Sequence, residues 1–350
     1  MKKSALYTSI LFIKFFIWLF FVCKKGKICY NKLMGNYIKG EQNKNKMGIS
    51  ALEPLTDAKI SGLTFSLAAI LPVLLSFVFL LILAFSGVAS QENYTEKDWY
   101  IYASYLLPQL AMAIIIFLYF RAKKTTINAE VKAQNCHWKY YVLAIALQFG
   151  LFSLSSLNNL FLEFLKNFGY QDTSLLLPSM EGFGLIGVLL VVAVLPAIFE
   201  EMIFRGLLFK GLKSFGSVGS VLLCGGFFAL YHQNPAQTIY QFCCGVAFAL
   251  VVLRAGSIFP TMLSHFLNNA LILILTKFEI TEFPLPTTIV MICLSAVCLI
   301  ASLTYFIFSK NTGKAPTDKK EKKTFFVFAA LGIFVSFLTW LFVFATGIVS

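Results

Sequence analysis

Long apolar runs separated by short polar segments follow one another along this chain of 350 residues. Most of them approach or exceed the roughly 20 apolar residues that a helix needs to cross a membrane. The pattern therefore predicts an all-α fold, a polytopic transmembrane helical bundle of about 8–10 spans. The nine clearest runs cover approximately residues 64–87, 99–120, 140–163, 183–204, 217–232, 236–253, 257–276, 286–308 and 325–348.

A weaker run lies in the basic N-terminal segment formed by residues 1–60. This run covers residues 5–23 and is interrupted by Lys14, and a stretch rich in Lys and Asn follows it up to Lys46. Three interpretations stay open for it: a signal-like segment, a weak first span, or residues that precede a start at Met47. We therefore base no function on this segment.

The composition indicates that lipid is the solvent of this chain. Hydrophobic residues make up 58% of it and charged residues 13%, whereas soluble domains have about 45–50% and about 25%. The formal net charge is +13, but the Lys and Arg residues lie in short loops, as topology signals that face anionic lipid do. The sequence offers no basic groove or aromatic stacking platform, so we expect membrane lipid and no nucleic acid among the partners.

The loop charges assign sides to the bundle under the positive-inside rule. Loops 24–59, 121–139 and 309–323 are rich in Lys and Arg, and the loops between them are acidic or neutral. We expect a multi-pass integral membrane protein, and the Lys- and Asn-rich N-terminus favours a bacterial plasma membrane. The eight cysteines fall mostly within apolar runs, without paired CxxC motifs at zinc spacing, so we interpret them as small buried residues.

Charged residues inside apolar runs are costly and are therefore candidates for function. Glu200, Glu201 and Arg205 lie at the end of one such run. Residues four positions apart share a helix face, and an acid that precedes its base is the favourable order for an ion pair. Glu201 and Arg205 are so placed, whereas Glu200 is turned about 100° away. A desolvated carboxylate without that partner is a candidate general base.

Two of the three histidines also lie in apolar context. His265 shares a helix face with Asn269, whose amide would orient the imidazole or donate to a developing oxyanion. If the chain reverses near Gly216, Glu200 and His232 both lie roughly 22–24 Å from the turn at about 1.5 Å per residue, so antiparallel neighbours would bring them to one level. His265 lies much nearer to the turn that precedes its helix, so that helix would have to be tilted or offset for His265 to reach the level of Glu200 and His232.

Each of these residues also has a purely structural interpretation. Glu200 would extend an ion-pair network with Arg205, and His232 would be an interfacial histidine. His265 and Asn269 would join helices through polar contacts. Together, however, they supply a base, two imidazoles and an amide, and this combination favours chemistry.

Three motifs in this order resemble those of the CAAX prenyl protease and bacteriocin-processing family, called CPBP or Abi. They are Glu200-Glu201-x-x-x-Arg205-Gly206, Phe228-x-x-x-His232 and His265-x-x-x-Asn269. The resemblance is specific because it includes the order and spacing of all three motifs. It divides the chain into the basic segment 1–60, N-terminal transmembrane helices at 61–180, a CPBP-like catalytic core at 181–276 and C-terminal transmembrane helices at 277–350.

The resemblance implies an intramembrane glutamic endopeptidase similar to CAAX prenyl protease 2. The implied catalytic residues are Glu200, His232, His265 and Asn269, and the implied site-shaping residues are Glu201 and Arg205. The first two catalytic residues would activate a water molecule, and the other two would stabilise the tetrahedral oxyanion. We expect no cofactor because there is no HExxH helix, although one Glu and two His would suffice as zinc ligands, namely Glu200, His232 and His265.

The expected substrate is a peptide or protein with a membrane-embedded or lipidated segment. In a bacterium, bacteriocin or pheromone processing or self-immunity is more plausible than the maturation of prenylated CAAX proteins. The alternative is a non-catalytic membrane scaffold or immunity protein that retains the motifs for structure. A transporter is disfavoured because the sequence has no inverted repeat with paired broken helices.

Overall fold

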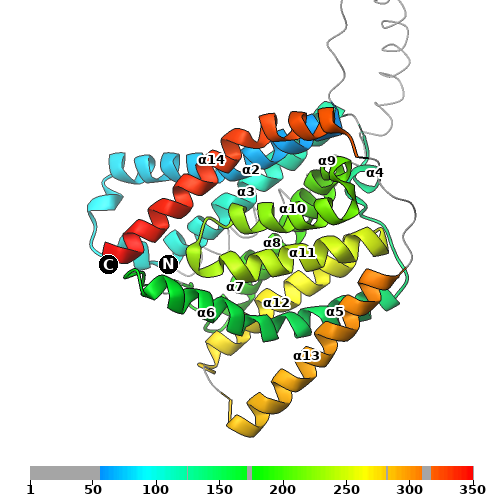
Figure 1. Cartoon of the computed structure of the whole chain (residues 1–350). Coiled ribbons are helices and arrows are strands. Elements are labelled where there is room, and N and C mark those ends of the chain that lie inside the picture. Colours follow the sequence, from blue (N-terminus) through cyan, green and yellow to red (C-terminus); the bar gives the residue numbers. More distant parts are fainter. Residues whose placement is uncertain (1–55, 124, 172–175, 281–282, 310–316, 350) are drawn as a thin grey trace, which may run out of the picture. The chain divides into compact units, whose positions relative to one another are not determined.

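A computed structural model describes residues 56–123, 125–171, 176–280, 283–309 and 317–349 (Figure 1). Within these ranges every regular element is a helix, so the predicted all-α class is confirmed. The chain from Leu55 onward forms one compact unit. The predicted weak first span and the start considered at Met47 lie outside the described residues.

Among the described residues, eight helical stretches are long and apolar enough to cross a membrane, which agrees with the predicted bundle. The longer helices are α2 (Asp57–Phe85), α3 (Asp98–Lys123), α5 (Lys139–Leu151), α6 (Ser155–Lys166), α10 (Gly216–Tyr231), α11 (Thr238–Ala255), α12 (Phe259–Lys277), α13 (Leu285–Phe308) and α14 (Lys319–Val349). The shorter ones that matter for the site are α4 (Ile127–Val131), η4 (Leu189–Val194), α8 (Leu195–Glu200), η5 (Glu201–Leu208) and α9 (Phe209–Leu212).

One helical stretch, Gly184–Tyr231, contains two of the predicted runs and reverses its direction at Gly216. Gly216 has a φ of +77°, a conformation that glycine adopts without steric cost. Beyond the turn, α10 runs back along η5: the ring centroids of Phe204 and Phe228 lie 5.1 Å apart, and the Cys224 thiol donates to the Phe204 carbonyl at 3.5 Å. The predicted reversal is therefore confirmed.

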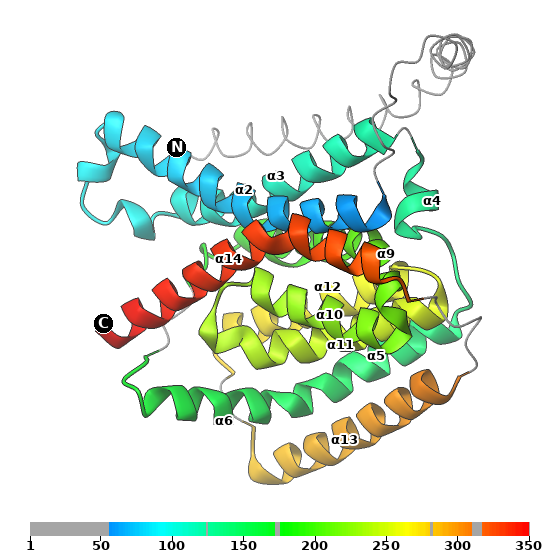
Figure 2. The ribbon, with the colours of Figure 1, turned by 45° about the horizontal axis from the view of Figure 1, so that its top comes forward.

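The first and last described helices, α2 and α14, lie side by side (Figures 1 and 2). Ser66 on α2 joins them, because its hydroxyl donates to the carbonyl of Phe328 at 2.6 Å and accepts from the N–H of Gly332 at 3.1 Å. Small residues allow this close approach of two backbones. The N-terminal and C-terminal transmembrane helices are thus packed together outside the segment that carries the motifs.

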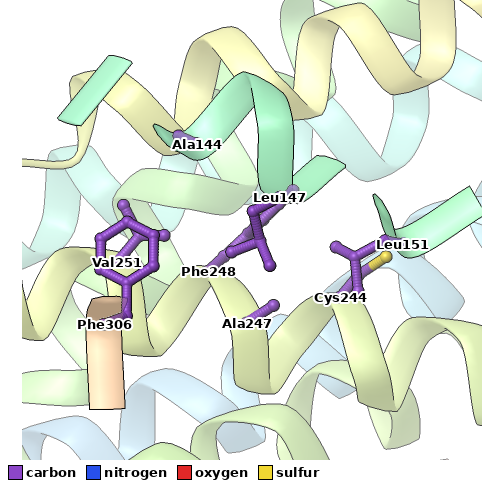
Figure 3. Packing of buried hydrophobic residues seen from close by; sticks show 8 residues of the cluster. All are labelled: Ala144, Leu147, Leu151, Cys244, Ala247, Phe248, Val251 and Phe306. Atoms are coloured by element: carbon purple, nitrogen blue, oxygen red, sulfur yellow. The ribbon is translucent and has the colours of Figure 1, made fainter. Parts of the chain in front are cut away.

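A second packing centre joins α5, α11 and α13 (Figure 3). Its buried apolar side chains are Ala144, Leu147, Leu151, Cys244, Ala247, Phe248, Val251 and Phe306. Because lipid tails are as apolar as these side chains, the association of the helices depends on close packing and on polar contacts. One polar contact is donated by Arg254 on α11, whose Nε lies 2.5 Å from the Phe306 carbonyl on α13.

The basic helix ends gather at one end of the unit, as the loop charges predict. Lys210 Nζ donates to Glu130 Oε2 at 2.6 Å, and the Tyr119 hydroxyl donates to the same oxygen at 2.7 Å. Lys123 pairs with Asp57 close by, at 2.9 Å. Burial by itself would raise the pKa of Glu130, but the hydrogen bonds from Lys210 and Tyr119 hold it below the usual range. Glu130 therefore links the short helix α4 to α3 and α9.

Glu130→Gln is expected to lower stability in a pH-dependent way. The pKa of Glu130 is lower in the folded state than in the unfolded chain, so its stabilisation is complete above about pH 4.3 and disappears as the pH falls through the folded-state pKa. At pH 7 the wild-type protein should be more stable by roughly 1.5–3 kcal/mol, typical of hydrogen bonds to a charged group. Thermal unfolding in detergent between pH 7 and pH 3 measures this. The exposed Glu163→Gln is the control, and an equal effect of both changes would contradict the assignment.

Two adjacent glycines on α10 provide a test of the packing between α10 and α11. A methyl group on Gly225 would overlap the Val246 side chain and lie 2.8 Å from the Val246 nitrogen, whereas one on Gly226 would meet nothing within 4 Å. Gly225→Ala should therefore destabilise the protein by about 1–3 kcal/mol. Gly226→Ala should be neutral or stabilising by up to about 1 kcal/mol. The melting temperatures of both variants in detergent measure this difference. Equal melting temperatures would contradict the close packing of α10 against α11.

Candidate active site

The motif helix is irregular just before its two glutamates. Helix α8 lies between two π-helical segments, η4 and η5. Such π-helical turns are frequent at functional sites. Pro196 has no N–H, so it cannot donate to the carbonyl of Val192, four residues earlier, as another residue would in an α-helix. The Asn269 side chain donates to this carbonyl, with Nδ2 lying 3.0 Å from the Val192 carbonyl oxygen. This hydrogen bond joins the motif helix to α12.

Glu201 and Arg205 form the ion pair that their spacing predicts. Arg205 Nη1 donates to Glu201 Oε1 at 2.9 Å, and both side chains are fully buried. The Arg205 guanidinium carbon also lies 4.1 Å from the ring centroid of Phe228 and 5.2 Å from that of Phe248. These ring faces attract the cation through their quadrupoles. A full charge can therefore be held in the apolar interior.

His265 meets both glutamates. Its Nδ1 lies 3.1 Å from Glu201 Oε1, the oxygen that also accepts from Arg205, and its Nε2 lies 3.8 Å from Glu200 Oε2. Because a carboxylate only accepts, Nδ1 carries the proton in this contact. The imidazole is therefore oriented by Glu201 and not by Asn269, and the sequence-based expectation that Asn269 orients it is replaced by this contact.

Glu200 has different surroundings from its neighbour in sequence. Its residue is 7% exposed, and its Oε2 has no hydrogen-bond partner within the part of the chain that the structure describes. The 3.8 Å to His265 Nε2 is too long for a hydrogen bond. The described contacts of Arg205 include a hydrogen bond to Glu201 and none to Glu200. A buried carboxylate oxygen is thus left open beside an imidazole.

His232 lies one aromatic ring away from this pair. Its Nδ1 is 2.8 Å from the carbonyl oxygen of Phe228, and because a carbonyl only accepts, Nδ1 carries the proton and Nε2 keeps its lone pair. The ring of Phe228 lies 4.7 Å from the His232 ring and 6.2 Å from the His265 ring. Between the described side chains of His232 and Glu200 there is no hydrogen bond. The structure therefore brings Glu200 to His265 directly, whereas His232 is linked to His265 through the ring of Phe228.

The described geometry does not group the three candidate zinc ligands of the sequence. Among the residues that the structure describes, no three His, Cys, Asp or Glu side chains are grouped so that they could hold a metal ion. Glu200, His232 and His265 therefore do not fit a shared metal in this arrangement. The expectation that the protein works without a cofactor stays a prediction.

A small cavity opens beside the imidazole of His265. Its lining residues are Phe228, Gln241, Cys244, Phe248, His265, Asn268 and Asn269. The space open to the centre of a water molecule is about 10 Å³, close to the lower limit for one bound water. His265 and Asn269 thus border the same cavity, as their spacing on one helix face predicts.

Three polar residues at the site were missed by the sequence analysis. Gln148 Nε2 on α5 and the Tyr240 hydroxyl on α11 both donate to Asn268 Oδ1, at 2.7 Å and 2.9 Å. Gln148 is 3% exposed and Asn268 8%. Charged groups and histidines stand out most clearly in an apolar run, but a buried amide also needs a partner. The position of Gln148 inside an apolar run was the feature of the sequence that could have pointed to this polar cluster.

Comparison with known proteins agrees with the motifs. Residues 182–271 match the family model Rce1-like, described as type II CAAX prenyl endopeptidase Rce1-like. No curated protein and no solved structure matches the chain. The match supports a CAAX-type intramembrane protease and covers the whole of the cluster built around Glu200. Residues 182–271 of the chain are thus similar to the CAAX protease-like family.

Proposed function

We propose that this protein is an intramembrane endopeptidase that hydrolyses a peptide bond with a water molecule activated by Glu200 and His232. One observation carries the proposal. Of two adjacent buried glutamates, Glu201 accepts hydrogen bonds from both Arg205 and His265 through its Oε1, whereas the Glu200 side chain has no described hydrogen bond and faces an imidazole at 3.8 Å. A buried, unpaired carboxylate next to polar donors is the arrangement that a general base needs.

In the first step, Glu200 takes a proton from a water molecule and the resulting hydroxide attacks the carbonyl carbon of the substrate. His232 assists through Nε2, which can accept a hydrogen bond from the water because Nδ1–H is engaged by the Phe228 carbonyl. The proton held by Glu200 then passes to the leaving amine as the carbon–nitrogen bond breaks. The carboxylate thus serves as base first and as acid afterwards.

His265 and Asn269 are proposed to stabilise the oxyanion. Both border the same small cavity, and both are held by other groups, His265 by Glu201 and Asn269 by the Val192 carbonyl. Donors that are held in place before the reaction stabilise developing charge without reorganisation. Glu201 and Arg205 shape the site by holding that imidazole.

The proposed substrate is a membrane-embedded or lipid-linked peptide, because the reacting groups belong to helices that are long and apolar enough to span a membrane. In a bacterial plasma membrane, bacteriocin or pheromone processing or self-immunity would supply such peptides. A non-catalytic scaffold or immunity protein is the competing function. It would need Arg205 and Glu201 for structure but would give no reason to bury an unpaired Glu200 beside them.

Glu200→Gln should abolish hydrolysis while leaving the fold intact. The amide has the same shape but cannot accept the proton, and general-base catalysis typically contributes roughly 10²–10⁴-fold to the rate. Purified wild-type and variant proteins are compared on a fluorogenic farnesylated peptide that ends in a CAAX sequence, with Glu163→Gln on α6 as the control. Mass spectrometry of cell-envelope peptides from cells carrying either protein identifies the bond cleaved in the cell. Unchanged hydrolysis by Glu200→Gln protein would reject the assigned base, and unchanged peptides in both experiments would favour the scaffold.

Glu201→Gln should instead reduce stability. It leaves the buried guanidinium of Arg205 without its counterion, and breaking a buried pair in this way typically costs about 3–5 kcal/mol. Glu200→Gln removes no such partner and should unfold close to the wild-type temperature. Thermal unfolding of the two variants in the same detergent makes the comparison. A larger loss for Glu200→Gln than for Glu201→Gln would contradict the roles given to the two glutamates.

A further inference from the structure

A chain of hydrogen bonds leads from α5 and α11 through α12 to the motif helix. Gln148 Nε2 and the Tyr240 hydroxyl donate to Asn268 Oδ1, at 2.7 Å and 2.9 Å. Asn268 Nδ2 donates to Asn269 Oδ1 at 3.0 Å, and Asn269 Nδ2 donates to the Val192 carbonyl at 3.0 Å. The chain ends at the Val192 carbonyl, to which Pro196, four residues later, has no N–H to donate.

The backbone carbonyl fixes the direction of every bond in this chain. A carbonyl can only accept, so Asn269 must present its nitrogen to Val192 and its oxygen to Asn268. Asn268 must then present its own nitrogen to Asn269 and its oxygen to Gln148 and Tyr240. Gln148 Nε2 and the Tyr240 hydroxyl are both donors to that oxygen. Gln148 Oε1, on the other side of the amide, has no partner among the described residues.

The amide of Asn269 is thereby held with one N–H to spare. A side-chain amide has two N–H donors, and the described hydrogen bonds use one of them, to Val192. Asn269 also borders the cavity that it shares with His265 and Asn268. We propose that Gln148, Tyr240 and Asn268 are positioning residues that act through Asn269, keeping its second N–H available to the oxyanion. This inference rests on the proposed function.

If these polar contacts only joined helices, their removal would affect stability and not catalysis specifically. A joining contact contributes to stability wherever it lies, and its loss should affect folding first. A positioning contact contributes most in the transition state, so its loss should lower kcat and leave KM nearly unchanged. It should also have no further effect once Asn269 has been removed, because residues that act as a unit are not additive.

The experiment measures kcat and KM of purified full-length variants on the fluorogenic farnesylated CAAX peptide, together with thermal unfolding. Asn268→Leu should lower kcat on the order of tenfold, less than the 10²–10³-fold loss typical of removing an oxyanion donor. In an Asn269→Ala background the same change should have no further effect. Tyr240→Phe removes one donor and should give a smaller loss of kcat. Tyr119→Phe is its matched control, because it also loses one hydroxyl contact, to Glu130 at the basic end, and should keep the wild-type kcat.

The outcomes separate this inference from the function on which it rests. Wild-type kcat in Asn268→Leu, or a loss that is additive with Asn269→Ala, would overturn the positioning role while an inactive Glu200→Gln protein still supports the peptidase. If Asn268→Leu does not fold, Tyr240→Phe decides, and equal kcat values for Tyr240→Phe and Tyr119→Phe would overturn the inference. Hydrolysis that survives in Glu200→Gln, or wild-type protein that cleaves neither the farnesylated peptide nor any cell-envelope peptide, would remove the proposed function and this inference together.

Discussion

The buried pair of Glu201 and Arg205 is the interaction on which the rest of the site depends. Neither charge has water to solvate it, so each requires the other, and the two aromatic faces of Phe228 and Phe248 complete the surroundings of the guanidinium. The same carboxylate oxygen accepts from His265. The pair therefore connects the motif helix η5 to α10, α11 and α12, and it places the imidazole that faces Glu200.

The contrast between two neighbouring glutamates explains how one helix can hold both a structural and a reactive carboxylate. A rotation of about 100° between consecutive residues puts them in different surroundings. One meets a cation and an imidazole in hydrogen-bonding contact, and the other meets only the far nitrogen of the imidazole, at 3.8 Å. The cost of burying the unpaired Glu200 is offset by packing and pairing elsewhere in the helix bundle, as is common where a site needs a reactive group.

Pro196 gives the site a second fixed point. A proline within a spanning helix is tolerated when another group satisfies the carbonyl that it frees, and here that group is Asn269. The contact joins the motif helix to α12, and Asn268 extends it to α5 and α11. Helices outside the three motifs are therefore part of the support of the site. The packing centre formed by α5, α11 and α13 holds two of these helices in place (Figure 3).

The sequence by itself determined the features that depend on local spacing and polarity. These are the spanning runs, the basic end of the bundle, the reversal at Gly216 and the pairing of Glu201 with Arg205, since each follows from the helical repeat or from the cost of a charge in lipid. Only the tertiary structure decided which imidazole meets Glu200. Counting residues from a turn favoured His232, but the packing of α12 brings His265 to it. Tilt and rotation of packed helices are set by contacts far apart in sequence, and for the same reason the partners of Gln148, Asn268 and Asn269 could not be found from spacing.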